Sequence, residues 1–211
     1  MDAEFFRAWL AEAGAAIEAQ RDHLTQLDAA IGDADHGINL ARGFSAIAVE
    51  LGQTATPTPG SVLTRAGATL ISKVGGASGP LYGMALRQAG KALGDSADVD
   101  LVGLANCLEA ALAGVQKLGA AREGEKTMVD ALAPAVSALQ KAVAEGAGTA
   151  EALSAAAAAA ADGAQATISM QALKGRASYL GPRSVGHEDP GAASTALIIG
   201  ALRDVALRQA P

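Results

Sequence analysis

The sequence predicts an all-α fold of up-and-down helices, and two observations support this prediction. Apolar residues recur at three- and four-residue steps along most of the 211-residue chain, as they do on the buried face of an amphipathic helix. We find no convincing run of alternating apolar and polar residues bounded by turns, which a half-buried strand requires. The predicted helices, joined by connections short enough to favour antiparallel neighbours, cover residues 2–22, 36–53, 60–73, 80–94, 100–118, 128–144, 149–171 and 191–209.

Local signals support individual helices in chain order. Apolar stripes mark the first, second, fifth, sixth and eighth, namely Phe6, Leu10, Ala13 and Ile17; Leu40, Phe44, Ile47 and Leu51; Leu101, Leu104, Leu108, Leu112 and Val115; Leu132, Val136, Leu139 and Val143; and Ile198, Leu202 and Val205. The fourth helix has Pro80 at a position suited to its first turn. The seventh is rich in alanine, which allows close packing against its neighbours.

Composition narrows the class of protein. The length suits one domain over residues 1–211, with an aliphatic core, because half of the residues are apolar and only 3% are aromatic. A net charge of −6 argues against a nucleic-acid surface. The single cysteine excludes an internal disulfide framework, the acidic N-terminus does not match a secretory signal, and no run approaches the length of a membrane span. We therefore expect a soluble, cytoplasmic protein that binds neither nucleic acid nor membrane.

The segment Leu27–Asn39 carries the strongest chemical signal. It places Asp28, Asp33 and Asp35 within eight positions. On a regular helix Asp33 would point away from the other two, but a break at Gly32 lets all three carboxylates turn toward one point. Converging anions need a cation, and Mg²⁺ is the economical choice, because a few carboxylates together with waters and phosphates hold it. The alternative is ordinary turn chemistry of aspartate beside glycine; an EF-hand calcium loop is excluded by spacing.

The seven connections between the predicted helices are of two kinds. Residues 52–60, 94–99 and 145–148 look generic, whereas the first, third, fifth and seventh connections are rich in potential ligands: 27–37, 74–79, 119–127 and 172–190. Alternate connections in an up-and-down array lie at the same end. We therefore expect all four ligand-rich connections to meet at one rim and to form one site.

One of these connections suits a phosphate, and a second only resembles a phosphate-binding loop. In Val74–Leu81 the glycines and the start of the following helix offer free backbone N–H groups, to which Ser78 adds a hydroxyl; the alternative is a tight turn with ordinary capping. Gly119–Thr127 resembles a Walker A loop but fails the test, because Glu125 separates the second glycine from Lys126 and a helix precedes the segment. Thr127 and Asp130 instead fit a capping box, and Lys126 is either a solvated charge or a phosphate contact.

The seventh connection is long and locally basic. Its cationic residues, Lys174, Arg176 and Arg183, suit an anionic ligand in an otherwise acidic protein. A loop of this length without regular structure is usually a lid, a binding loop or a disordered segment. Asp189 and Pro190 form a good start for the last helix, and we interpret His187 as a loop residue. The sequence lacks a serine nucleophile elbow, a cysteine–histidine dyad and paired zinc-type cysteines, so the residues indicate a site for Mg²⁺ and phosphate.

These motifs resemble, from end to end, the nucleotide-binding L subunits of bacterial dihydroxyacetone kinases. The resemblance is carried by Leu27–Gly37, Val74–Pro80, Gly124–Met128, Lys174–Gly181 and Ser184–Gly191. It implies a closed barrel of eight antiparallel helices that holds ADP or ATP and two Mg²⁺ ions at one end. It further implies that Asp28, Asp33 and Asp35 bind the metal and that Arg176 stabilises charge during catalysis. The nucleotide contacts would be His36, Gly37, Ile38, Asn39, Ala77, Ser78, Gly119, Met128, Arg176, Asp189, Pro190 and Gly191.

The resemblance also implies a function with two alternatives. Where the L subunit is a separate chain, its bound ADP is phosphorylated by a phosphohistidine-bearing M subunit of the phosphotransferase system. The phosphoryl group then passes to dihydroxyacetone on a K subunit. We favour this reading because the chain has no K domain. The alternatives are a subunit of an ATP-dependent kinase for dihydroxyacetone or another small ketose, and a module that reports its nucleotide state to a transcriptional regulator.

Overall fold

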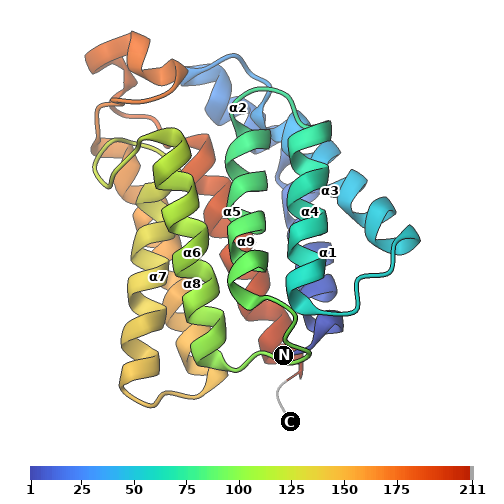
Figure 1. Cartoon of the computed structure of the whole chain (residues 1–211). Helices are drawn as coiled ribbons and strands as arrows, with labels where there is room; N and C mark the ends of the chain where they lie inside the picture. Colours follow the sequence, from blue (N-terminus) through green and yellow to red (C-terminus); the bar gives the residue numbers. More distant parts are fainter. Residues whose placement is uncertain (210–211) are drawn as a thin grey trace.

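The structure, a computed structural model, describes residues 1–209 and is built from helices (Figure 1). Within these residues there are nine α-helices and no strand, which confirms the predicted all-α class. The helices are α1 (Ala3–Ala19), α2 (Arg21–Ile31), α3 (His36–Gln53), α4 (Pro59–Lys73), α5 (Ser78–Leu93), α6 (Leu101–Gly119), α7 (Val129–Ala144), α8 (Thr149–Ala166) and α9 (Pro190–Gln209). Two 3-10 segments, η1 (Thr167–Ser169) and η2 (Arg176–Ser184), lie between α8 and α9.

All of these helices except α2 form a closed ring (Figure 1). α1 packs on α3, each helix from α3 to α8 packs on the one that follows it, and α9 returns to α1. The inward faces build one large core, mostly of leucine, isoleucine, valine and alanine. Three of its five aromatic side chains, Phe5, Phe6 and Trp9, lie on α1; the other two are Phe44 on α3 and Tyr82 on α5. The fold is therefore a barrel of eight helices, as the resemblance implied.

The predicted first helix, residues 2–22, is wrong in its extent. α1 ends at Ala19, and the additional helix α2 follows at once. α2 lies outside the ring and packs on α3 and α9. Its buried residues are Leu24, Asp28 and Ile31, so a charged residue occupies one position of its buried face. The first ligand-rich connection therefore begins inside a helix.

Three other boundaries differ from the predicted ones. The helix expected over 149–171 ends as α8 at Ala166 and continues as η1. The long connection 172–190 is not without structure, because it contains η2, which is kinked at Gly181. α5 begins at Ser78 rather than at Pro80. Pro80 is thus the third residue of the helix, where a missing N–H leaves no hydrogen bond unmade.

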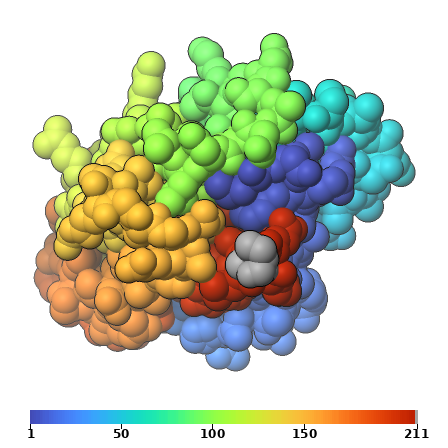
Figure 2. All heavy atoms as spheres, turned by 90° about the horizontal axis from the view of Figure 1, so that it is seen from below, coloured from blue at the N-terminus to red at the C-terminus, as the bar shows by residue number. Residues whose placement is uncertain are grey.

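The two ends of the barrel differ in what they carry. α2 and the connection 172–190 lie at one end, which we call the α2 end (Figure 1). α1 begins and α9 ends at the opposite end, which Figure 2 shows face-on. There Met1 and Gln209 lie close to Asp98 and Gly148, which belong to the connections α5–α6 and α7–α8.

Two helices of the ring, α6 and α9, reach the length and mean hydropathy of a membrane-spanning helix. This corrects the expectation that no run approaches such a length. α6 packs on α5 and α7, and α9 packs on α8 and α1. Packing inside the barrel buries about half of the apolar stretch of α9 (56%) and a third of that of α6 (33%).

Candidate functional site

A cavity of about 310 Å³ opens at the α2 end of the barrel. Its lining residues come from all four ligand-rich connections and from the helix ends beside them. The prediction that these connections meet at one rim is therefore confirmed. The additional helix α2 did not disturb the argument, because it lies outside the ring and leaves the alternation of the eight ring helices intact.

Most of the predicted site residues line this cavity, namely Asp28, Asp33, Asp35, His36, Ala77, Ser78, Gly119, Met128, Arg176, Asp189, Pro190 and Gly191. Three predicted nucleotide contacts are not among its lining. Ile38 points outward and is 51% exposed. Asn39 is buried and accepts a hydrogen bond from Arg42. Gly37 faces the backbone of Arg21, where a Cβ would collide with the carbonyl oxygen, so it serves the close packing of α3 on α2.

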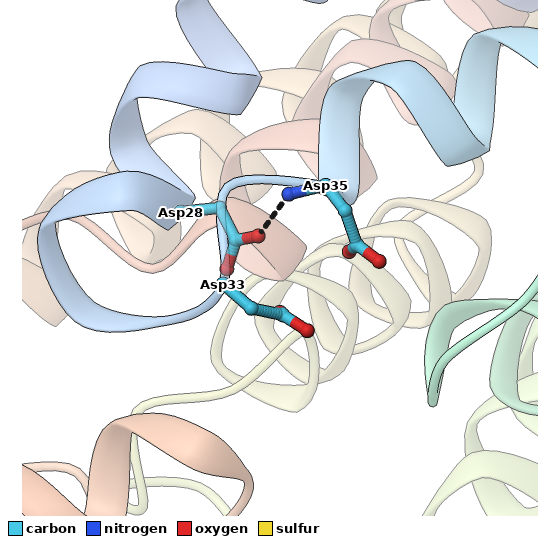
Figure 3. A group of neighbouring side chains, drawn as sticks. All are labelled: Asp28, Asp33 and Asp35. Atoms are coloured by element: carbon cyan, nitrogen blue, oxygen red, sulfur yellow. Dashed lines mark hydrogen bonds between the residues drawn. The ribbon is translucent and has the colours of Figure 1, made fainter.

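The three aspartates converge from different elements (Figure 3). Asp28 lies in the last turn of α2, Asp33 in the connection, and Asp35 at the N-cap of α3. One carboxylate oxygen from each lies within 4.8 Å of the others. An oxygen of Asp28 also accepts hydrogen bonds from the backbone N–H groups of Asp35, at 2.8 Å, and His36, at 3.2 Å. A cluster of three hard oxygen donors fits a divalent cation such as Mg²⁺.

Local backbone geometry makes this convergence possible. Gly32 is the C-cap of α2, as the predicted helix break requires. A Cβ at this position would collide with the carboxylate of Asp28, so only glycine leaves that side chain in place. Ala34 adopts a left-handed conformation with φ 61°, which turns the chain between the second and third aspartates.

Arg176 is the cation paired with this cluster among the described residues. Its guanidinium lies 3.0 Å from the carboxylate of Asp33 and is largely exposed at the start of η2. One guanidinium leaves most of the negative charge of three carboxylates unbalanced. The arrangement therefore suits a bound cation rather than a self-sufficient ion pair.

His36 is the first residue of α3 and its ring is fixed by two hydroxyl groups. Nδ1 lies 3.1 Å from Ser78 Oγ, and Nε2 lies 2.8 Å from Ser194 Oγ on α9. Burial lowers the pKa of this imidazole, and the nearby Asp28 and Asp35 oppose the shift only in part. His36 thus joins the aspartate cluster to α5 and α9 through neutral hydrogen bonds.

The glycine-rich connection presents the start of α5 to the cavity. Gly76, Ala77 and Ser78 line it, and Ala77 is the N-cap without a side-chain hydrogen bond of its own. The first N–H groups of a helix lack partners inside the helix and form the positive end of its dipole. This wall can accept an anion such as a phosphate.

The opposite wall is the start of α9. Asp189 precedes Pro190 and accepts a 2.7 Å hydrogen bond from the N–H of Ala192, so the predicted N-cap is confirmed. Asp189 is buried, and burial raises the pKa of its carboxyl group from 3.8 to about 7. The carboxyl group of Asp189 therefore gains or loses its proton near neutral pH, at the edge of the site.

Two further residues build the site: Tyr82, which the sequence did not single out, and Lys126, which was expected to be either a solvated charge or a phosphate contact. Tyr82 lines the cavity, and its hydroxyl contacts Gly191 O at 2.9 Å and Ser194 Oγ at 2.7 Å. Lys126 is 1% exposed, so it is not a solvated charge. The position of Tyr82 one turn beyond Ser78 was the available signal for this residue. Nothing in the sequence indicated that Lys126 is buried.

The chain is similar to one protein family in its sequence and in its fold. The family model described as the DAK2 domain matches residues 30–204. The ADP-binding subunit DhaL of PEP-dependent dihydroxyacetone kinase 1 from Listeria innocua is 43% identical over 201 residues, covering 95% of this chain and 96% of the relative. The corresponding subunit from Escherichia coli K12 is 42% identical over 186 residues, 88% of this chain and 89% of the relative. The crystal structure of the dihydroxyacetone kinase from C. freundii in complex with AMP-PNP and Mg²⁺ superposes with a TM-score of 0.74 at 29% identity, and covers 95% of this chain and 34% of that longer one.

Proposed function

The chain belongs to the DAK2 domain family, and from this premise we propose that it is the ADP-binding subunit of a dihydroxyacetone kinase. The main support is the match of more than 40% identity to two such subunits over almost the full length of each chain. The aspartate cluster beside a helix N-terminus supplies the chemistry that this function needs. We further propose that the protein acts in the cytoplasm.

In this proposal the cavity holds a nucleoside diphosphate or triphosphate with Mg²⁺. Asp28, Asp33 and Asp35 would hold the metal, and we propose two ions, because three carboxylates exceed what one small cation in contact with phosphates usually takes. When bound, the metal supplies charge neutralisation for the transferred phosphoryl group. The backbone N–H groups at Ala77 and Ser78 would hold phosphate oxygens.

The other proposed residues orient the nucleotide and stabilise charge. The rest of the cavity is lined by His36, Gly119, Met128 and the turn Asp189–Gly191. We propose that Gly37, Ile38 and Asn39 contact the nucleotide only in the arrangement that the chain adopts when the nucleotide is bound. Arg176, exposed at the rim, would place its guanidinium on the phosphoryl group during transfer. No general base is required in this chain, because the acceptor hydroxyl would lie in a partner subunit.

We propose a relay for the phosphoryl donor. A phosphohistidine on an M subunit would transfer its phosphoryl group to the β-phosphate of bound ADP, which regenerates the histidine and forms ATP. The γ-phosphoryl group would then pass to a hydroxyl of dihydroxyacetone on a K subunit, which gives dihydroxyacetone phosphate and returns ADP. The opening of the cavity at one end of the barrel is compatible with alternate approach of two partners.

Free ATP is the second candidate donor. The C. freundii kinase of similar fold was crystallised with AMP-PNP, an analogue of ATP, and Mg²⁺. Purified chain mixed with K and M partners and phosphoenolpyruvate, with and without added ATP, separates the two donors. Product formed from catalytic amounts of ADP supports the relay, whereas a stoichiometric requirement for ATP supports the alternative.

Asp35→Ala tests the site directly. We expect this variant to lose Mg²⁺ and Mg²⁺-dependent ADP binding together, as measured by titration calorimetry, because it removes one of three converging ligands. Normal binding of Mg²⁺ and ADP by the folded variant would refute the assignment.

A further inference from the structure

Lys126 is a fully buried lysine in the wall of the cavity. Its exposed fraction is 1%, although lysine is among the residues least often buried without a partner. Its backbone adopts a left-handed conformation with φ 61° between Glu125 and Thr127. Such a conformation is unfavourable for a residue with a Cβ, so the surrounding structure must compensate for it.

The ammonium group of Lys126 reaches two backbone carbonyls from distant parts of the chain. It donates a hydrogen bond of 2.6 Å to Thr167 O and a second hydrogen bond to His187 O. Thr167 is the C-cap of α8, where the unpaired carbonyls form the negative end of the helix dipole. The lysine thus connects the turn before α7, the end of α8 and the segment before α9.

Thr167 is attached to the same segment by a second route. Its Oγ1 accepts a 2.9 Å hydrogen bond from the N–H of Asp189, and the carbonyl oxygen of the following residue, Ile168, accepts one of 2.7 Å from the N–H of Gly186. Lys126 and η1 therefore both form hydrogen bonds with residues 186–189. These residues lead directly into the turn Asp189–Gly191, which lines the cavity.

The pKa of the Lys126 ammonium is lowered overall. Burial is the larger cause, and the nearby carboxyl groups of Asp189, Asp130 and Glu188 oppose it only in part. Two of the three N–H donors are already used by carbonyls. The ammonium group is therefore held in place by the protein and is not a mobile charge available to bind phosphate.

We propose that Lys126 is a positioning residue that holds the turn Asp189–Gly191 in its nucleotide-binding geometry by joining His187 to the end of α8. This inference rests on the proposed function for the identity of the ligand. The hydrogen bonds of Lys126 to Thr167 and His187 do not depend on that function. Lys126, in the Gly124–Met128 motif, would then fix the shape of the site without contacting the phosphates.

The test compares Lys126→Met with Lys117→Met. Methionine keeps most of the apolar stem and removes the ammonium, and Lys117 is an exposed lysine of α6 that controls for the loss of one charge. We expect Lys126→Met to bind Mg²⁺–ADP about tenfold more weakly, the size of effect typical of groups that orient a ligand-binding residue. The control should bind within about twofold of the unchanged protein. Titration calorimetry at a temperature well below the unfolding transition gives both values.

Amide hydrogen exchange without nucleotide distinguishes positioning from general destabilisation. In Lys126→Met the N–H groups of Gly186 and Asp189 should exchange faster, while amides in α4 and α5 keep their native rates. Unchanged exchange at these two amides, or ADP affinity within twofold of the unchanged protein, would overturn the proposal. If the unchanged protein fails to bind ADP, the proposed function fails, and the exchange result still decides the role of Lys126.

A measurement on the unchanged protein keeps the proposal testable if the variant does not fold. Brief treatment with an amine-reactive acylating reagent, followed by mass spectrometry of peptides, should modify the exposed Lys117 and Lys91 and spare Lys126 at least about tenfold. Equal modification of Lys126 would contradict a buried and carbonyl-bound ammonium.

Discussion

The carboxylate of Asp28 accepts a 2.8 Å hydrogen bond from the backbone N–H of Asp35. This bond joins the last turn of α2 to the N-cap of α3, so two of the three proposed metal ligands are connected before any cation binds (Figure 3). Asp28 therefore has two roles, as an acceptor that shapes the connection and as an anion in the cluster. Different substitutions separate these roles.

Asp28→Asn and Asp28→Ala should differ in stability but not in metal binding. Asparagine keeps an acceptor oxygen for the N–H of Asp35, whereas alanine leaves a partly buried N–H group without a partner, which costs about 1–3 kcal/mol. Urea unfolding without metal should show that loss for alanine and a change within about 0.5 kcal/mol for asparagine. Both variants should lose at least about tenfold in Mg²⁺ affinity. Equal stabilities would contradict the bridging role.

Gly32→Ala should damage the metal site although Gly32 itself supplies no metal ligand. A Cβ at position 32 would displace the Asp28 carboxylate, so Mg²⁺ affinity should fall about tenfold. The matched control is Gly52→Ala near the end of α3, where a Cβ meets no neighbouring atom. That exchange should leave binding intact and raise stability by up to about 1 kcal/mol, because alanine favours helix. Calorimetry with Mg²⁺ and urea unfolding give the two readouts.

Ala120→Gly should stabilise the protein. Ala120 is the C-cap of α6 and has left-handed angles, φ 47° and ψ 37°, which cost a residue with a Cβ about 1–2 kcal/mol. Glycine removes this cost but adds entropy to the unfolded chain, so the net gain should be about 0.5 kcal/mol. Ala113→Gly, on the exposed face of the same helix, should instead lose about 1 kcal/mol. A loss of stability for both variants in urea unfolding would contradict the left-handed cap.

Asp189→Asn should change how stability depends on pH. The folded protein holds the Asp189 proton up to about pH 7, whereas the unfolded chain releases it near 3.8. Between these values the unfolded state binds fewer protons, so this group makes the free energy of unfolding fall as pH rises. Asparagine lacks this term and keeps the acceptor for Ala192. The stability of the variant relative to the unchanged protein should therefore rise between pH 4 and pH 7, by at most about 4 kcal/mol.

Urea unfolding at several pH values between 4 and 7.5 checks this expectation. Because the comparison is between two proteins that share every other titratable group, the remaining pH dependence cancels. A constant difference between the two proteins over this range would show that Asp189 ionises normally in the fold.

Periodicity was sufficient to predict the ring helices, because each of them buries one apolar face. The order of the connections was sufficient to place the aspartates, the glycine-rich turn and Arg176 at one end. Neither the apolar periodicity nor the order of the connections changes when a helix boundary shifts by a few residues. For this reason the cavity lining agrees with most of the predicted site residues even though several boundaries were wrong.

The parts that could not be predicted are those where function and packing share a position. Asp28 occupies the buried face of α2 between Leu24 and Ile31, so the stripe that would have revealed this helix contains a carboxylate. Lys126 is apparent only in three dimensions, because its two carbonyl partners lie 41 and 61 residues further along the chain. A sequence pattern records local spacing and contains no information about such partners.

Met1 and Gln209 lie beside Asp98 and Gly148 at the end of the barrel opposite the α2 end, and this has a practical consequence (Figure 1). A tether or an affinity tag attached before α1 or after α9 leaves the mouth of the barrel facing the solution. Protein immobilised through either end can therefore be used to measure capture of nucleotide, or of a second protein, without obstruction by the support.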